Sequence, residues 1–473
     1  MNSAELLEHL RALLGEAQVL TAAADVEPYV HDWRGRYHGT TLAVLRPAST
    51  AELAASLRLC AAAGVSIVPQ GGNTGLCGGA TPGGEDSVLI SLTRLRRIRA
   101  LDVANSTITV EAGCTLAEVQ AAAAAVDRLF PLSLASEGSC TIGGNIATNA
   151  GGVQVLRYGN MRELVLGLEV VLPDGRIWDG LRGLRKDNSG YDLKQLFIGA
   201  EGTLGVVSAA VLKLFPALHS HATAWASVAS PAAALELLQL LRSECGERLT
   251  AFELIGRQAF ELVLAHIPGA RAPLASRDGH APWQVLIEIA DSAAAAALDQ
   301  QLSSVLAQAS AQGLLDDAVV ASSQAQAQAL WALRENISAA QKSAGFSIKH
   351  DIAVPLSAIP LFLERAAVQL RARWPDVRIV VFGHVGDGNL HYNLSRPAAD
   401  NAAFVTEDSV AANRIVYALV AELAGSIAAE HGLGQLKKDE FRRYKSPIEI
   451  ELMRTLKQAF DPAGRMNPGK LID

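Results

Sequence analysis

The chain contains 473 residues, of which 50% are hydrophobic and 19% are charged, and its formal net charge is -7. This length exceeds what one hydrophobic core usually serves, so two or three structural units are expected, and the balance excludes an intrinsically disordered chain. The acidic net charge and the dispersed Lys and Arg residues argue against a protein that binds nucleic acid.

The cysteines and the N-terminus indicate a reducing compartment. Five cysteines occur without any Cys-x-x-Cys pair, which argues against an iron–sulfur cluster or a structural zinc site. The N-terminus lacks a basic segment followed by an apolar one, and no apolar run has the length of a transmembrane helix. We therefore expect a cytoplasmic protein without a transmembrane segment.

The first 217 residues are predicted to form a domain of alternating helices and short strands. Helices are predicted at Ala4–Leu14, Ala51–Ala63 and Thr115 to Val126, and strands at Leu42–Arg46, Val65–Val68, Val88–Ser91, Thr107–Glu111, Leu164–Leu172 and Val206–Phe215. Pro216 ends the last of these strands, and we place a domain boundary after it.

Two long glycine-rich segments lie in this domain. The first, Pro69–Gly79, directly follows a strand, and the second spans Gly138–Gly152. Glycine allows backbone N–H groups to approach a phosphate closely, because no Cβ intervenes. Two such segments suit a ligand with two phosphates and a long body. Neither contains the G-x-G-x-x-G pattern of dinucleotide-binding folds or the G-x-x-x-x-G-K-[ST] pattern of nucleotide triphosphatases.

Together with the third glycine-rich segment, Glu201–Val206, these segments resemble the FAD-binding domain of the vanillyl-alcohol oxidase / p-cresol methylhydroxylase superfamily. The resemblance implies that the loops hold the pyrophosphate of FAD. Some members attach FAD through His or Cys. The first segment contains no His, so we expect non-covalent FAD, with a thioether link through Cys77 or Cys140 as the alternative. The expected cofactor-binding residues are Pro69, Gly71, Gly72, Asn73, Thr74, Gly75, Leu76, Gly78, Gly79, Ser139, Thr141, Gly143, Gly144, Asn145, Thr148, Asn149, Gly151, Glu201, Gly202, Gly205, Val206 and Asn467.

Residues 218–425 are predicted to form a second domain, of α+β class, with helices packed on an antiparallel sheet. The expected elements are strands at Ala224–Val228 and Gln284–Ala290, helices at Pro231–Ser243 and Ser292–Gln312, and a loop at Pro268–Pro282. Residues 426–473 are expected to form a C-terminal segment, with a helix at Pro447–Phe460, that returns to the flavin.

The segment Arg378–Asn393, RIVVFGHVGDGNLHYN, is predicted to be a β-hairpin with Asp387-Gly388 as its two-residue turn. That register places His384 directly opposite His391 on one face, with Cβ atoms about 4.5–5.5 Å apart. Asn393 follows on the same face. Two imidazoles at this spacing suit a shared divalent metal.

The segment Ser426–Lys438 supplies a third ligand, the carboxylate of Glu430, and His431 beside it can accept a proton. With the hairpin and Asn467-Pro468-Gly469-Lys470, it resembles the D-2-hydroxyglutarate dehydrogenases and their D-lactate- and glycolate-oxidising relatives over essentially the whole chain. This resemblance implies that His384, His391 and Glu430 bind Zn²⁺ or another divalent metal. It also implies that Asn393 and His431 contact the substrate.

Three further residues are expected to hold a second substrate carboxylate. Arg334 and Ser338 lie four residues apart on a predicted helix, Trp331–Ser338, and Lys349 lies on a predicted strand, Ser347–Ile352. Exposed Arg and Lys are normally only solvated. However, a buried carboxylate needs a cation, and the resemblance assigns these three positions to the distal carboxylate of D-2-hydroxyglutarate.

The expected function is an FAD- and metal-dependent dehydrogenase that oxidises D-2-hydroxyglutarate, and D-malate more weakly, to the 2-oxo acid. The metal would lower the pKa of the substrate hydroxyl, His431 would act as general base, and hydride would pass from C2 to flavin N5. The alternatives are a D-lactate or glycolate dehydrogenase on the same scaffold, or a non-catalytic flavin-binding subunit. The resemblance suggests an electron-transfer flavoprotein or a quinone as electron acceptor, and we expect a homodimer.

Overall fold

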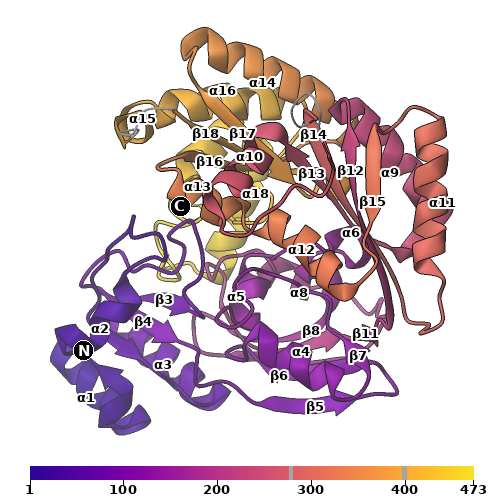
Figure 1. Cartoon of the computed structure of the whole chain (residues 1–473). Coiled ribbons are helices and arrows are strands. Elements are labelled where there is room, and N and C mark those ends of the chain that lie inside the picture. The colour runs from indigo at the N-terminus through magenta and orange to yellow at the C-terminus, as the bar shows by residue number, and fades with distance from the viewer. Residues whose placement is uncertain (276–280, 397–401, 473) are drawn as a thin grey trace. The chain divides into compact units, whose positions relative to one another are not determined.

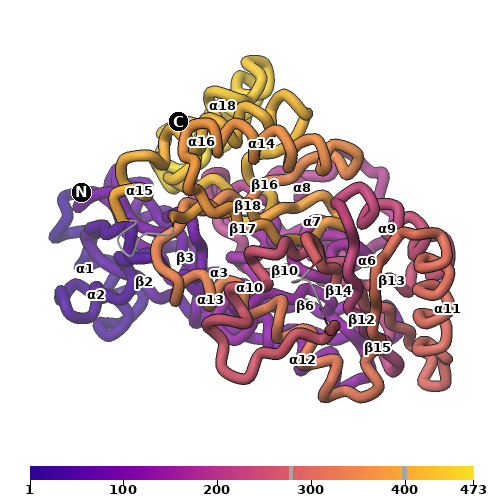
Figure 2. Tube along the Cα trace, turned by 45° about the horizontal axis from the view of Figure 1, so that its top comes forward, coloured from indigo at the N-terminus to yellow at the C-terminus, as the bar shows by residue number. Residues whose placement is uncertain are grey.

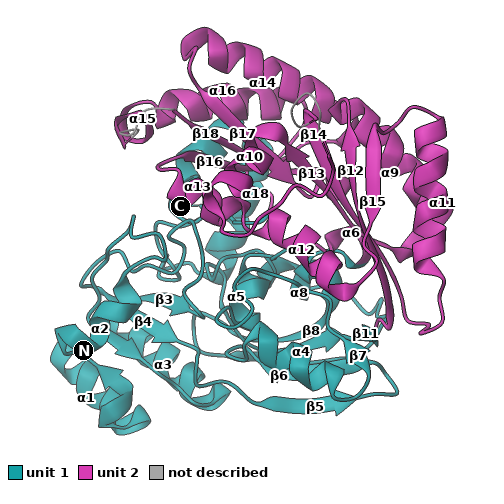
Figure 3. Cartoon of the chain, in the orientation of Figure 1, with its two compact units in different colours: residues 1–152, 158–217, 430–473 teal, residues 153–157, 218–429 magenta. Residues whose placement is uncertain are grey.

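The computed structural model describes residues 1–275, 281–396 and 402–472, and its chain forms two compact units (Figures 1 and 3). Unit 1 contains residues 1–152, 158–217 and 430–473, and unit 2 contains residues 153–157 and 218–429. Part of the predicted loop Pro268–Pro282, residues 276–280, lies outside the described residues. Among the helices of the described ranges, none combines the length and the apolar character needed to cross a membrane.

The described residues of unit 1 form three sheets, of four strands, of five strands and of the two strands β11 and β7. In the first, ordered β1-β2-β4-β3, strand β4 pairs in parallel with both β2 and β3; the second, ordered β5-β6-β10-β8-β9, is antiparallel. The strands are β1 (Val19–Leu20), β2 (Ala43–Leu45), β3 (Ser66–Gln70), β4 (Ser87–Ser91), β5 (Ile98–Asp102), β6 (Thr107–Glu111), β7 (Arg128–Leu129), β8 (Val165–Val171), β9 (Ile177–Gly180), β10 (Val206–Lys213) and β11 (Phe215–Pro216). The helices are α1 (Ser3–Leu14), α2 (Ala23–Val30), α3 (Thr50–Ala63), α4 (Leu116–Ala124), α5 (Ile142–Ala147), α7 (Met161–Leu164), α8 (Lys194–Phe197), α17 (Lys438–Tyr444) and α18 (Pro447–Phe460).

Helix α3 shows how the sequence sets these elements. The Ser49 side chain accepts a hydrogen bond from the N–H of Glu52 and so caps the N-terminus. Gly64, in the left-handed region at φ 73°, ends the helix. The helix buries Leu53 and Leu57 in the core of the first sheet. This packing holds β3 in place, and the first glycine-rich segment follows directly from β3.

The second sheet of unit 1 is cross-linked by ion pairs between an arginine and two buried carboxylates. Arg99 on β5 contacts Glu111 on β6 at 3.2 Å and Glu169 on β8 at 3.0 Å. Burial raises the pKa of Glu169, but hydrogen bonds from Arg99, Thr50 and Ser208 outweigh it and hold the pKa below its usual value. The carboxylates therefore stay charged and cross-link the sheet at neutral pH.

Unit 2 is built on one seven-stranded antiparallel sheet, ordered β15-β12-β14-β13-β17-β18-β16. The strands are β12 (Ser220–Val228), β13 (Leu249–Gly256), β14 (Trp283–Asp291), β15 (Asp317–Val320), β16 (Ile348–Ala353), β17 (Arg378–Gly383) and β18 (Asn389–Ser395). The helices are α9 (Pro231–Cys245), α10 (Arg257–His266), α11 (Leu298–Ala311), α12 (Gln324–Glu335), α13 (Ile337–Ser343), α14 (Ile359–Arg373), α15 (Ala402–Glu407) and α16 (Ser409–Glu422), and α6 (Val155–Tyr158) spans the break between the units.

Helices pack on both faces of this sheet. On one face, α14 lies beside α16, as Figures 1 and 2 show from two directions, and His350 of β16 contacts Tyr417 of α16. On the opposite face, α10, α12 and α13 bury Phe260, Leu333 and Ile337 against the strands. The predicted α+β class with an antiparallel sheet is therefore confirmed.

Two helix predictions differ from the structure. Helix α11 begins at Leu298 and not at Ser292. The predicted helix Trp331–Ser338 is wrong as one element, because α12 ends at Glu335 and α13 begins at Ile337. The side chain of Asn336 donates to the carbonyl of Ala332 at 2.8 Å, and such local bonds compete with helix continuation. Arg334 and Ser338 therefore lie on separate helices.

The predicted two-residue turn of the histidine hairpin is also wrong. Strands β17 and β18 pair with Phe382 opposite His391, two residues away from the predicted register. Residues 384–388 form the connection, which closes through Gly388 at φ 90° and a hydrogen bond from the N–H of Asn389 to the Asp387 carboxylate. A shift of two residues keeps each side chain on its face, so His391 and Asn393 still share one side of the sheet.

Candidate active site

One face of the unit 2 sheet carries a row of polar side chains across four neighbouring strands. Asp351 of β16 pairs with His391 of β18, and Phe382 of β17 pairs with His391 from the other side. Ile255 of β13 pairs with Phe382, so Glu253, two residues before it, points to this same face. Sheet register alone thus gathers a histidine and two carboxylates.

Glu253 is the centre of this row, and it was not predicted from the sequence. Its carboxylate lies 2.6 Å from Nδ1 of His384 and accepts a hydrogen bond of 2.8 Å from Nε of Arg334. All three side chains are buried. Burial raises the pKa of Glu253, but the charges of His384 and Arg334 outweigh it and lower the pKa to about 2. Arg334 also stacks on Phe382, with Cζ 4.9 Å from the ring centroid.

His391 also has a carboxylate near its Nδ1 atom. Its Nδ1 lies 4.0 Å from Asp351, whose Oδ1 accepts a hydrogen bond of 3.0 Å from Asn389. The centroids of the two imidazoles, His384 and His391, are 5.8 Å apart. Histidines that bind metals usually donate their second ring nitrogen to a carboxylate or carbonyl. The donor set within unit 2 therefore fits a divalent metal bound by the Nε2 atoms.

The sheet of unit 2 brings some of the predicted substrate residues together, but not all of them. Lys349 and Asn393 are opposite each other in the β16–β18 pairing, on the face that carries His391. Asn393 is buried, and its Nδ2 donates to Gln341 at 2.9 Å, whereas Lys349 is exposed. Ser338 is exposed on α13. The sheet thus brings Lys349 and Asn393 together, and Arg334 joins the row through Glu253.

The glycine-rich segments of unit 1 pack against each other. A Cβ on Gly71 would lie 2.3 Å from Thr141 Oγ1, and one on Gly72 would lie 2.0 Å from the Ser139 carbonyl oxygen. These two positions therefore require glycine for the contact between segments. A Cβ on Gly75 or on Gly138 would meet no atom within 4 Å, so neither position requires glycine for a contact within the protein.

Two polar atoms of these segments support a ligand site. Thr141 Oγ1 and Asn467 Oδ1 are buried without a hydrogen-bond partner among residues 1–275, 281–396 and 402–472. Buried polar atoms are normally paired. Side-chain acceptors and donors beside glycine backbone suit a nucleotide cofactor, so these residues fit FAD.

The C-terminal residues of unit 1 are bound to the glycine-rich segments. Asn467 donates from Nδ2 to the carbonyl oxygens of Gly79, at 2.9 Å, and Glu201, at 2.8 Å. The Glu201 carboxylate accepts the N–H groups of Leu433 and Gly434, each at 2.8 Å. Glu201 therefore positions the segment that follows Glu430. Burial raises the pKa of this carboxyl, and the two N–H groups oppose that shift.

Glu430 and His431 are the first residues of the last segment of unit 1, whereas the two histidines of the hairpin belong to unit 2. The joint role of Glu430 and the hairpin stays a prediction.

The expected cofactor residues Asn145 and Thr148 belong to the second glycine-rich segment. Residues 142–147 of this segment form α5, a short helix that was not predicted from the sequence.

Comparison with known proteins gives two family matches and several relatives. Residues 41–180 match an FAD binding domain, and residues 218–471 match the C-terminal domain of FAD linked oxidases. The chain is 40% identical to a D-2-hydroxyglutarate dehydrogenase of Xanthomonas citri pv. viticola, over 96% of this chain and 94% of the relative. It is 39% identical to a mitochondrial D-2-hydroxyglutarate dehydrogenase of Bos taurus, over 96% of this chain and 81% of the relative.

The fold is also similar to that of a solved flavoenzyme. A crystal structure of p-cresol methylhydroxylase with bound substrate gives a TM-score of 0.78 at 16% identity, over 99% of this chain and 96% of that one. At this identity the similarity shows the fold alone. It confirms the superfamily fold that the glycine-rich segments predicted.

Proposed function

The chain belongs to the FAD-linked oxidases, in the family that contains the D-2-hydroxyglutarate dehydrogenases, and we propose that it oxidises D-2-hydroxyglutarate to the 2-oxo acid. The observation that carries the proposal is the buried contact of Glu253 with both His384 and Arg334. One carboxylate thereby orients a candidate metal ligand and a cation suited to a substrate carboxylate. D-malate, which also has two carboxylates, is proposed as a weaker substrate.

Arg334 and Lys349 are proposed to hold the distal carboxylate of the substrate. Among the described residues, Arg334 uses Nε for Glu253, which leaves its two Nη atoms for a bidentate contact. Lys349 adds a positive charge on the same face of the sheet. Ser338 and Asn393 are proposed to complete the contacts with the acid.

Glu430 is proposed to join His384 and His391 as the third ligand of a divalent metal, Zn²⁺ by preference. The chain connection supports this assignment. Ser426 forms a β-bridge with Ala353, which pairs with Asn389, two residues before His391. Glu430 follows Ser426 by four residues, a span of at most about 14 Å, so the backbone tethers its carboxylate near the hairpin.

In the proposed reaction the substrate hydroxyl and C1 carboxylate face the metal ligands. A bound divalent metal would lower the pKa of that hydroxyl. His431 would take the hydroxyl proton as general base. FAD, when bound, supplies the acceptor for the C2 hydrogen and its two electrons. Glu253 would keep the His384 ring in the orientation that presents Nε2.

The test of the proposed function is turnover of D-2-hydroxy acids with an artificial dye as electron acceptor. We expect D-2-hydroxyglutarate to give the highest kcat/KM, and we expect chelation to abolish the turnover and added Zn²⁺ to restore it. No turnover with any D-2-hydroxy acid would favour the non-catalytic subunit. A preference for D-lactate would favour the alternative substrate class.

FAD is proposed to bind non-covalently, and a pair of glycine variants tests the site. Gly72→Ala is expected to lower the melting temperature of the FAD-free protein, because its Cβ meets the Ser139 carbonyl. Gly75→Ala is expected to leave that melting temperature unchanged, because its Cβ would meet no atom within 4 Å. It is expected to weaken FAD binding by about tenfold or more, because Gly75 is proposed to face the cofactor. Unchanged FAD affinity in Gly75→Ala would contradict this placement of the cofactor.

The remaining assignments concern the surroundings of the enzyme. We propose an electron-transfer flavoprotein or a quinone as electron acceptor, because the chain lacks a dinucleotide-binding fingerprint. The five cysteines are buried, and Cys60, Cys114, Cys140 and Cys245 are free thiols, which supports a reducing compartment such as the cytoplasm. A homodimer is proposed, and size-exclusion chromatography with light scattering tests it.

A further inference from the structure

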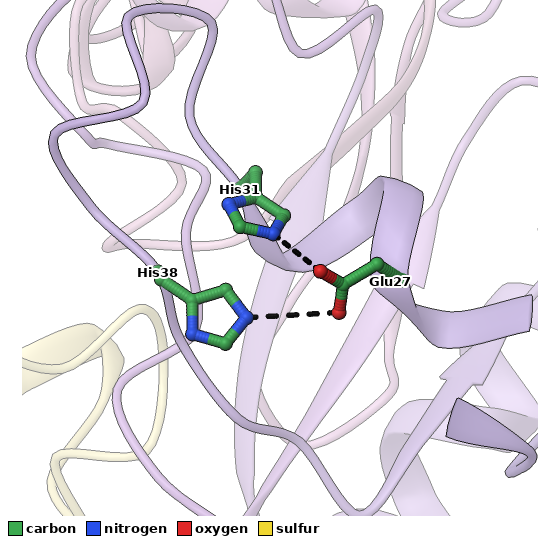
Figure 4. Close-up of side chains that lie close together, drawn as sticks. All are labelled: Glu27, His31 and His38. Atoms are coloured by element: carbon green, nitrogen blue, oxygen red, sulfur yellow. Dashed lines mark hydrogen bonds and ion pairs between the residues drawn. The ribbon is translucent and has the colours of Figure 1, made fainter. Parts of the chain in front are cut away.

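A second group of metal-ligating side chains lies in unit 1, formed by Glu27, His31 and His38 (Figure 4). Glu27 contacts His31 Nε2 with Oε1 at 2.6 Å and His38 Nε2 with Oε2 at 3.6 Å. The two imidazole centroids are 4.2 Å apart. One ligand atom from each residue lies within 4.8 Å of the other two.

The local fold brings these three residues together. Glu27 is on α2 and His31 follows it by four residues at the end of that helix, so both face the same side. His31 and His38 form an antiparallel bridge, flanked by the hydrogen bonds Gly39 N–H to Val30 O and Asp32 N–H to Tyr37 O. This is the non-hydrogen-bonded type of pair, in which opposite side chains approach most closely.

The turn between the two histidines is fixed by a buried side chain. The Asp32 carboxylate accepts the N–H groups of Arg36 at 2.6 Å and Tyr37 at 2.7 Å. Asp32 itself is only 5% exposed. The backbone that carries both imidazoles is therefore held in place, and only the exposed ends of the ligand side chains need to adjust.

We propose that Glu27, His31 and His38 bind one divalent transition-metal ion, with Zn²⁺ as the natural choice. Two imidazole nitrogens and a carboxylate oxygen suit Zn²⁺. They disfavour Mg²⁺ and Ca²⁺, which prefer oxygen ligands alone. Tetrahedral Zn²⁺ places its nitrogen and oxygen ligands about 3.4 Å apart, which the 2.6 Å and 3.6 Å contacts bracket. The site is separate from the one proposed at His384 and His391.

Residues 29–37 contact the first glycine-rich segment, so a metal bound at this site would affect that segment. The bridge leaves the His31 carbonyl free of strand hydrogen bonds, and that oxygen accepts Nδ2 of Asn73 at 2.8 Å. Gln70 donates to the Tyr29 carbonyl, also at 2.8 Å, and a Cβ on Gly78 would lie 2.5 Å from the Tyr37 ring. A metal that clamps residues 27–38 would therefore hold the first glycine-rich segment in place. Because linkage is reciprocal, Zn²⁺ and FAD would strengthen each other's binding.

The test counts Zn²⁺ per chain in the FAD-loaded protein after dialysis against a buffered free Zn²⁺ concentration that saturates the wild type. We expect His38→Ala and Glu27→Gln each to bind one ion fewer, with the affinity of this site lowered at least about 100-fold. His9→Ala removes an exposed histidine of unit 1 outside the cluster and should change nothing. His384→Ala reports the other proposed metal, so a failure there is read separately. A Zn²⁺ count in His38→Ala equal to the wild type overturns the site.

The linkage is tested by the Kd of FAD with and without Zn²⁺. In the wild type we expect Zn²⁺ to lower this Kd by about fivefold or more, and in His38→Ala we expect no change, with turnover at saturating FAD preserved. Glu27→Gln provides a second variant of the same shape. An equal effect of Zn²⁺ on FAD binding in the wild type and both variants overturns the link to the cofactor segment.

Discussion

Replacing Glu253 with glutamine is expected to lower the affinity for the proposed catalytic metal by about 10- to 100-fold. The variant keeps the size of the side chain and removes its charge. His384 then loses the anionic partner at 2.6 Å that orients its ring, and Arg334 loses its only charged partner among the described residues. At limiting metal, kcat/KM should fall in the same proportion.

The measurement is a metal titration of activity, with metal content determined in parallel. High metal concentration should recover most of the kcat of Glu253→Gln, because Glu253 acts through His384 and is a positioning residue. His384→Ala should not recover. Glu288→Gln, a control in the same sheet whose carboxylate accepts a hydrogen bond from Trp331, should bind metal like the wild type. Wild-type metal affinity in Glu253→Gln would rule out the positioning role.

A loss of folding stability should accompany the loss of metal affinity. Glu253 is 1% exposed and Arg334 8%, and breaking a buried pair by removing one charge costs about 3–5 kcal/mol. The melting temperature of Glu253→Gln should therefore fall, whereas that of Glu288→Gln should fall less. Measuring metal affinity well below the melting temperature keeps the two effects apart.

The sequence predicted the glycine-rich segments because turns and close backbone approach leave a local trace. It did not separate the reasons for each glycine. A Cβ added at Gly71 or Gly72 would collide with the second segment, some 70 residues away in the chain, whereas a Cβ at Gly75 would point into open space. Only the packed structure distinguishes a contact within the protein from room for a ligand.

The sequence predicted a hairpin at the two histidines correctly, but it predicted the wrong pairing register for the two strands. Asp387-Gly388 is a strong local signal for a two-residue turn, but hydrogen bonds within residues 384–389 favour a longer connection. Because the error is two residues, the side of the sheet is preserved. His384 and His391 therefore lie close together although they are not directly opposite.

Glu253 could not be assigned from local pattern, because its partners are 81 and 131 residues away. One signal was present. Glu253 is the only charged residue of β13, LTAFELIG, an otherwise nearly apolar run. A charge in a buried strand is costly unless it is paired, so an isolated carboxylate in such a strand indicates a buried partner even when the partner cannot be named.

Lys349→Met is expected to lower kcat/KM for D-2-hydroxyglutarate by about 30- to 1,000-fold, equivalent to about 2–4 kcal/mol of transition-state binding. The proposed role of Lys349 is limited to the distal carboxylate, which D-lactate lacks. The value for D-lactate should therefore change less than about threefold. Lys342→Met, on the last turn of α13, is the matched control and should change neither value.

Arg334→Ala should behave differently, because Arg334 serves the substrate and Glu253 at once. Its loss is expected to lower kcat/KM for both acids, with the larger loss for the diacid. The ratio of the two kcat/KM values then isolates the carboxylate contact, and the loss for D-lactate measures the disturbance of Glu253 and His384. If Lys349→Met lowers both values equally, or if the wild type prefers D-lactate, the distal carboxylate is not bound here. The FAD and metal assignments do not depend on that outcome, since they rest on the glycine-rich segments and the histidine pair.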